Sequence, residues 1–446
     1  MSVHDEHSLE TPALTRAIGP KLLLFFVIGD ILGTGIYTLT GDVAVEVGGA
    51  AWASFGLAFF VAMFTATSYV ELVSKYPRAA GAALYVHRAF GLHFLTFLVA
   101  FTVMSSGLTS AGAASRGFAG YFTELMDGVF VPPELVVAIA FLLVLGALNF
   151  RGVTESVKAN MVLTCIELGG LVVVIVVGAF VLAGGGGDPA RSFEFAPGGN
   201  PFTLVVGGAG LAFFALVGFE DSVNMAEETT DPQRTFPRAL LLGLTITGIV
   251  YVLVAFFTTA VVPLDVLAQS ETDLLEVIRA GAAWFPLGLF ALISLCAVSN
   301  SALINLMMAS RLLYGMAHEG IVPASLGHVH AERRTPWVAI LFTTVLAIGL
   351  ASWSGVRQLG GTTALLLLCV FTLVNVAVLV LRARPVEHAH YRAPTILPVL
   401  GAVSSAYLAS PWSGRDGSEY EIAGVLLAIG LVLWLVNWLI HGRRRA

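Results

Sequence analysis

Charged residues are scarce in this sequence. Asp, Glu, Lys and Arg together make up 12% of its 446 residues, whereas hydrophobic residues make up 57%. Soluble globular domains carry about 25% charged residues. The composition therefore excludes a soluble globular protein and predicts a polytopic membrane protein embedded in a lipid bilayer.

Cysteine is also rare, and motifs for phosphate or metal binding are absent. The three cysteines, Cys165, Cys296 and Cys369, fall in different apolar segments, so we expect small buried hydrophobic side chains and no disulfide framework. The sequence has no Walker-type Gly-rich loop and no Cys/His cluster with metal-ligand spacing. We therefore expect no metal, no cofactor, no nucleic-acid partner and neither an ATP-driven pump nor an enzyme.

Long apolar runs are what the sequence has instead. A helix that spans the hydrocarbon layer needs about 20 apolar residues. Twelve segments approach or exceed this length, at residues 21–47, 50–74, 92–125, 133–150, 158–183, 201–229, 238–262, 285–316, 337–354, 361–382, 395–412 and 421–440. Lys and Arg gather in the loops on the side of the N-terminus, which predicts that both termini are cytoplasmic.

The first apolar segment contains a short stretch that is unfavourable for a continuous helix. Gly33 and Gly35 flank Thr34, and the acidic Asp30 lies three residues before Gly33. We interpret this as a point where the helix unwinds, which lipid tolerates only beside protein or an aqueous cavity. The carbonyl of Ile31 and the amides that begin the outer half would then be free to bind an ammonium and a carboxylate. Both groups occur together in an α-amino acid, although close helix packing is a second interpretation of the same glycines.

The sixth apolar segment has a similar interruption. Gly218 is followed by Glu220 and Asp221 in the middle of the segment. Segments one and six occupy corresponding positions if five helices repeat with inverted topology. Matching interruptions in two halves indicate a transporter site near the bilayer midplane.

Further polar groups lie inside the apolar segments. Glu167 is a carboxylate in segment five, and an intramembrane carboxylate is a functional candidate by default, with a structural hydrogen-bonded acid as the alternative. Ser299 and Ser301 in segment eight are weaker candidates for the wall of a cation site, because hydrogen bonding between helices is the commoner use of such residues.

Several of these motifs resemble those of the amino acid–polyamine–organocation (APC) superfamily. The matching stretches are Val27–Tyr37, Tyr69–Leu72 with Tyr76–Gly81, Gly218–Glu220 with Glu227–Arg238, and Ser310–Ala317 with Glu319, Gly320 and Pro323. Asn149–Val153 with Glu155 and Ser156 is most similar to the cationic amino acid transporter branch and its bacterial relatives.

The resemblance implies a fold and a set of substrate contacts. The fold is an all-α membrane protein of twelve helices in a five-plus-five inverted repeat, with helices one and six broken. The substrate carboxylate would meet amides at Gly33, Thr34 and Gly35. The ammonium would meet carbonyls of one residue in the first helix and three in the sixth: Ile31, Phe214, Ala215 and Val217. The aromatic ring at Phe214 would act as an outer gate.

The sequence departs from this family at two acidic positions. Several proton-coupled relatives carry a lysine where Glu167 stands, so proton coupling here would use a neutral acid and an anion in place of a cation and a neutral amine. Asp30 stands where relatives often have a neutral residue, and it adds an acid near the ammonium side of the site.

The sequence therefore predicts a secondary active amino acid transporter that works by proton-coupled symport and alternating access. Glu167 is the first candidate for the coupling proton, followed by Glu220, Asp221 and Asp30. An exchanger, a sodium symporter and an ion channel remain alternatives, and a cationic or a neutral amino acid fits the pocket equally well. We expect an N-terminal tail at residues 1–18 and two inverted repeats at residues 19–183 and 184–382. The final pair of helices, at residues 383–446, is expected to pack peripherally or to form a homodimer.

Overall fold

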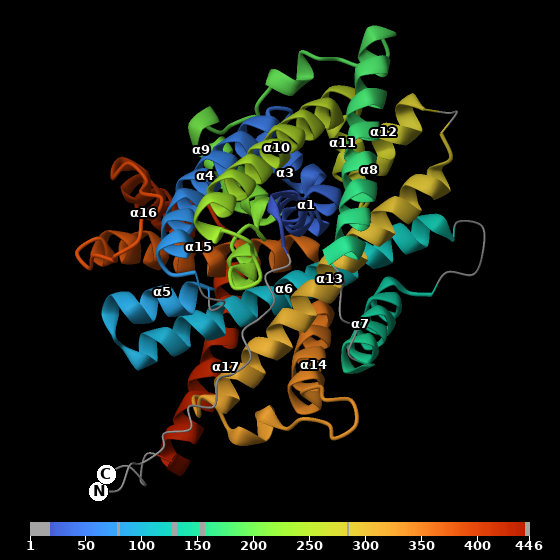
Figure 1. The fold of residues 1–446 in the computed structure, drawn as a ribbon. Helices are drawn as coiled ribbons and strands as arrows, with labels where there is room; N and C mark the ends of the chain where they lie inside the picture. Colours follow the sequence, from blue (N-terminus) through green and yellow to red (C-terminus); the bar gives the residue numbers. More distant parts are fainter. Residues whose placement is uncertain (1–17, 78–80, 127–131, 152–156, 283–284, 442–446) are drawn as a thin grey trace, which may run out of the picture.

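A computed structural model describes residues 18–77, 81–126, 132–151, 157–282 and 285–441 of the chain (Figure 1). The polar tail and parts of two motifs, at residues 78–80 and 152–156, lie outside these ranges. The α-helices are α1 (Pro20–Ile31), α2 (Thr34–Thr38), α3 (Thr40–Val47), α4 (Ala51–Lys75), α5 (Gly81–Phe90), α6 (His93–Leu125), α7 (Glu134–Arg151), α8 (Val157–Ala183), α9 (Pro201–Ala212), α10 (Pro232–Val261), α11 (Leu264–Leu267), α12 (Asp273–Gly281), α13 (Leu287–His318), α14 (Trp337–Trp353), α15 (Val356–Leu381), α16 (Ile396–Ala409) and α17 (Gly417–His441).

The described part of the chain is helical and contains no strand beyond an isolated bridge between Ile18 and Thr229. Ten helices there are long and apolar enough to cross a membrane. Two more apolar helices, α14 and α16, are shorter, with 17 and 14 residues. Each of the twelve predicted segments thus corresponds to helical structure. The protein is a multi-pass membrane protein.

The two longest helices form the centre of the packing. The 33-residue α6 and the 32-residue α13 pack against each other and cross in Figure 1. At 1.5 Å per residue, each is about 48–50 Å long, which exceeds the hydrocarbon thickness of about 30 Å. Both helices therefore tilt or extend beyond the apolar layer.

The acidic loop after α10 forms two short helices, α11 and α12. The prediction for the cysteines was wrong, because Cys165, Cys296 and Cys369 are all exposed on helix surfaces. Apolar surroundings exist on both faces of a membrane helix. A small apolar thiol can therefore face lipid as readily as the protein interior.

Two arginines anchor the last helices to the rest of the bundle. Arg382, directly after α15, donates to both carboxylate oxygens of Glu71 on α4 at 2.8 and 2.6 Å. Arg415, between α16 and α17, pairs with Glu419 and donates to the carbonyls of Gly210 on α9 and Gly361 on α15, both at 3.0 Å. The loop that precedes the final helix therefore reaches the helices that form the candidate site.

Candidate functional site

The first membrane span is broken where the sequence predicted. Helix α1 ends at Ile31, and Leu32 is extended with φ −64° and ψ 131°. Gly33 is also extended, and α2 begins at Thr34. The first amides of α2 have no acceptor within the helix. The Ile31 carbonyl, at the other side of the break, accepts a hydrogen bond from the Tyr251 hydroxyl at 2.9 Å.

The sixth span is broken over a longer stretch. Helix α9 ends at Ala212 and is followed by a 3₁₀ turn at Phe213–Leu216. Val217 is extended, Gly218 has a φ of +122°, and a second 3₁₀ turn covers Asp221–Met225. The positive φ explains the glycine, because a residue with a side chain rarely adopts this conformation.

The two breaks lie directly against each other. A Cβ atom placed on Gly218 would be 2.4 Å from the carbonyl oxygen of Asp30. A Cβ atom placed on Gly35 would be 2.4 Å from the Cα of Ala215. In both places a glycine on one broken helix allows the backbone of the other to approach. Residues about 180 positions apart in the chain therefore form one structural unit.

A small cavity of about 30 Å³ lies between the breaks. Most of the predicted substrate residues line it, together with three of the other candidates: Ile31, Gly33, Thr34, Gly35, Phe214 and Val217, with Asp30, Asp221 and Ser301. Ala215 packs against Gly35 and is not among the lining residues. A space of this size holds about one water molecule, so the site is closed in this conformation.

A second cavity of about 20 Å³ adjoins the first. The two cavities share Val217, Asp221 and Asn305 in their walls, and Glu220 lines the second alone. Two lining residues of the first cavity, Ser110 on α6 and Asn305 on α13, were not predicted. They are uncharged polar residues in long apolar helices, and such residues also serve as ordinary contacts between helices.

Glu167 is not part of either cavity wall. It is fully buried on α8, and one of its carboxylate oxygens accepts a hydrogen bond from Asn300 on α13 at 3.3 Å. Its backbone carbonyl accepts from the Tyr37 hydroxyl at 2.8 Å, which joins α8 to α2. Ser299 precedes Asn300 and does not line the cavities. Glu167 therefore contacts both the outer half of the first span and α13.

Phe214 lies between the first cavity and α15. Its side chain is 5% exposed, and its ring would be 3.0 Å from a Cβ atom placed on Gly360. The ring thus covers one wall of the cavity and fills the space beside a helix that has no side chain at this point.

Comparison with known proteins assigns this arrangement to a family. The sequence pattern of the amino acid permeases matches residues 18–433, which is most of the chain. The chain belongs to the amino acid permease family. It is an amino acid transporter of the APC superfamily and not an enzyme.

The relatives of this permease differ in what their names say they carry. It is 28% identical to the branched-chain amino acid permease BcaP of Bacillus subtilis, over 83% of this chain and 82% of that protein. It is 30% identical to cationic amino acid transporter 4 of Mus musculus, over 85% of this chain and 61% of that longer protein. It is 26% identical to the methylthioribose transporter of Bacillus subtilis, over 96% of this chain and 94% of that protein.

The permease has a set of polar contacts around the outer half of its first span. Arg357 on α15 forms an ion pair with Glu46 and lies 3.6 Å from a carboxylate oxygen of Asp42, both on α3. The backbone amide of Gly41 donates to the carboxylate of Asp273 at 2.6 Å. Burial raises the pKa of the Asp273 carboxyl well above its ordinary value, and this hydrogen bond acts in the opposite direction. These contacts hold α3 against α12 and α15.

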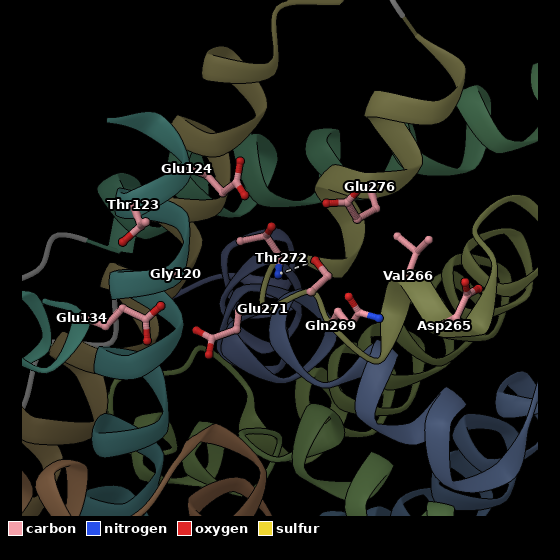
Figure 2. Close-up of a pocket in the computed structure, with 11 residues that line it drawn as sticks. Gly120, Thr123, Glu124, Glu134, Asp265, Val266, Gln269, Glu271, Thr272 and Glu276 are labelled. Atoms are coloured by element: carbon pink, nitrogen blue, oxygen red, sulfur yellow. Dashed lines mark hydrogen bonds between the residues drawn. The ribbon is translucent and has the colours of Figure 1, made fainter. Parts of the chain in front are cut away.

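An open cavity of about 460 Å³ forms an acidic vestibule in the permease (Figure 2). Five acidic residues line it. They come from α6, α7, α11, the loop between α11 and α12, and α12, and are in this order Glu124, Glu134, Asp265, Glu271 and Glu276. Figure 2 shows Glu134 and Glu271 on adjacent walls. Desolvation and then the neighbouring Glu134 raise the pKa of the Glu271 carboxyl, whereas Arg116 acts in the opposite direction. None of the described lining residues is basic.

Proposed function

We propose that this amino acid transporter is a proton-coupled symporter that works by alternating access in the cytoplasmic membrane, with both termini cytoplasmic. The contact between the two broken spans around a closed cavity is the observation that carries the proposal. Broken helices supply free backbone amides and carbonyls only near the break, so both charged groups of an amino acid can be bound there. The family match supports an amino acid as the substrate.

The proposed fold has twelve spans in two inverted repeats, at residues 19–183 and 184–382. The final pair, at residues 383–446, lies outside the repeats and is proposed to support a homodimer. Alternating access would then move the broken spans relative to the surrounding helices. A cavity of about 30 Å³ cannot hold an amino acid, so the proposed cycle needs these helices to separate.

In the proposed site, the substrate carboxylate binds the amides of Gly33, Thr34 and Gly35. The ammonium binds carbonyls at the ends of the inner halves, at Ile31 and Val217, with the Phe214 and Ala215 carbonyls nearby. The Ile31 carbonyl has a second lone pair, so it can accept the ammonium while it keeps the hydrogen bond from Tyr251. The Phe214 ring acts as the gate.

We propose Glu167 as the group that carries the coupling proton. It is buried on α8. Its contacts with Asn300 and Tyr37 connect α8 to α13 and to α2, which would move relative to each other in the proposed cycle. A change in the charge of its carboxyl group would alter the hydrogen bond from Asn300, because Asn300 donates to that group. Glu220, Asp221 and Asp30 are the further candidates for proton binding, and Ser299 and Ser301 are candidates for a cation site beside them.

The test is tracer uptake into liposomes that contain the purified protein, without sodium, with labelled alanine or arginine, and with or without an inward proton gradient. We expect accumulation driven by the gradient. Glu167→Gln should abolish accumulation and preserve exchange against preloaded amino acid, whereas the exposed carboxylate variant Glu194→Gln should behave as the wild type. Gradient-driven accumulation in Glu167→Gln would exclude Glu167 as the proton carrier.

The uptake assay and a current recording separate the alternative functions. Uptake that requires preloaded amino acid would identify an exchanger, and uptake that requires sodium would identify a sodium symporter. Large single-channel currents in a planar bilayer would identify a channel. Each of these outcomes would contradict proton-coupled symport.

A further inference from the structure

The cavity next to the proposed substrate site is lined by apolar residues and by two acidic residues. Its remaining lining residues are mainly apolar and come from α6, α13 and α15: Val103, Ser106, Gly107, Met308, Ala309, Leu312, Thr363 and Leu367. The two acidic residues Glu220 and Asp221 also line this cavity. The space is therefore apolar along most of its surface and acidic at one place.

The acidic place has no cationic partner in the described structure. None of the described residues that line either cavity is Lys, Arg or His. The ion pairs found among the described residues include neither Glu220 nor Asp221. Glu220 is only 6% exposed, and one of its oxygens accepts a hydrogen bond from the Gly218 amide at 2.9 Å.

An acidic pair inside a membrane protein needs neutralisation. A buried carboxylate that has no cation nearby carries a large desolvation cost, and a second carboxylate beside it adds repulsion. A bound proton or a bound cation removes both costs. The position of the pair fits a cation that belongs to the substrate, because Asp221 lies in the walls of both cavities.

We propose that Asp221, supported by Glu220, binds the cationic end of the substrate side chain and makes this transporter selective for cationic amino acids. This inference rests on the proposed amino acid site between the two breaks. The backbone of the substrate would occupy the first cavity. Its aliphatic stem would follow the apolar walls past Val217, and its ammonium or guanidinium would reach the two carboxylates. Lysine and arginine have this combination of an apolar stem and a charged end.

The conformational change that admits the substrate would join the two spaces. The shared wall consists of Val217, Asp221 and Asn305, and Asn305 also donates to the Ser301 carbonyl at 2.9 Å. Separation of α13 from the sixth span removes part of this wall. Asp221 would then face the side chain of a bound substrate directly.

The test compares arginine with citrulline, which has a nearly identical shape and a neutral end group. Uptake of each is measured in liposomes with an inward proton gradient, for the wild type, Asp221→Asn and Asp221→Glu. We expect the wild type to prefer arginine at least tenfold in kcat/KM. Asp221→Asn should lower kcat/KM for arginine at least tenfold more than kcat/KM for citrulline, and Asp221→Glu should restore part of the preference.

The outcomes separate this inference from the proposed function. Equal loss of both substrates in Asp221→Asn would overturn the inference, because a proton-binding or purely structural role affects both. Citrulline or alanine uptake by a wild type that does not carry arginine would overturn it too, while leaving symport intact. Gradient-driven uptake of no amino acid would instead contradict the proposed function, and the inference with it.

Two controls keep the test interpretable. The acidic vestibule also attracts cations, but its exposed charges are screened by salt. The arginine preference should therefore persist at high ionic strength, and a preference that disappears with salt would assign selectivity to the vestibule. If the variants do not fold, competition by citrulline against labelled arginine in the wild type decides, since equal potency would refute the proposal.

Discussion

The close contact between the two broken spans makes a sharp prediction for Gly35→Ala. The new Cβ atom would lie 2.4 Å from the Cα of Ala215 and 2.8 Å from its nitrogen, whereas Cβ contacts below 3.0 Å essentially never occur. The obstacle is backbone, so rotation of a side chain cannot relieve the overlap. The two spans must separate by roughly 0.6 Å at this point.

The expected cost follows from this overlap. Forcing an extra methyl group into packed structure costs about 1–3 kcal/mol. We expect Gly35→Ala to lower the unfolding free energy by this amount. The closed conformation is the one in which the two spans touch, so its population relative to open states should fall about fivefold to a hundredfold.

Thermal stability, followed by size-exclusion chromatography after heating, measures the loss of unfolding free energy. Tracer uptake in liposomes measures the effect of the changed population of the closed conformation. Gly169→Ala and Gly315→Ala are matched controls, because each lies in a helix and a Cβ atom there has nothing within 4 Å. Alanine is the better helix former, so these variants should equal or slightly exceed the wild type in stability. Wild-type stability and uptake in Gly35→Ala would refute the proposed packing of the two breaks.

Two further predictions concern charged groups at the ends of the bundle. Arg382→Gln should lower the unfolding free energy by about 3–5 kcal/mol, because it leaves the buried carboxylate of Glu71 without its partner. Arg234→Gln, which removes an exposed ion pair, should change it by less than about 1 kcal/mol, and equal thermal shifts for the two variants would contradict this. Burial raises the pKa of Asp273, so the folded state retains a proton that the unfolded state releases, and stability should fall as the pH rises above about 4. Asp273→Asn should remove this part of the pH dependence in thermal melts at a series of pH values, and the exposed Asp265→Asn should not.

Much of the fold could be predicted because the bilayer restricts what a spanning segment can be. Each of the twelve apolar segments corresponds to helical structure. The break at Gly33 was predictable since glycine and an acid are both unfavourable in the interior of a membrane helix. The sequence does not indicate which face of a helix meets lipid, which is why the burial of the cysteines was predicted wrongly.

Other parts of the site depend on contacts between distant segments. The contact of Gly218 with the Asp30 carbonyl is set by how the two breaks pack, and each break alone gives no sign of it. Ser110 and Asn305 line the first cavity although nothing in their local sequence separates them from ordinary interhelical contacts. The separation of Glu167 from the cavity walls likewise follows from helix packing alone.

The anchoring of the sixth span by Arg415 bears on how easily α9 can move away from α15. One guanidinium, with a side chain only 2% exposed, holds the Gly210 carbonyl of α9 and the Gly361 carbonyl of α15 at 3.0 Å each. Any motion that parts α9 from α15 breaks at least one of these bonds. A hydrogen bond to a charged group contributes about 1.5–3 kcal/mol, so each bond makes the parted arrangement about ten- to a hundredfold rarer. The residue that limits this separation lies between the last two helices, outside the proposed repeats.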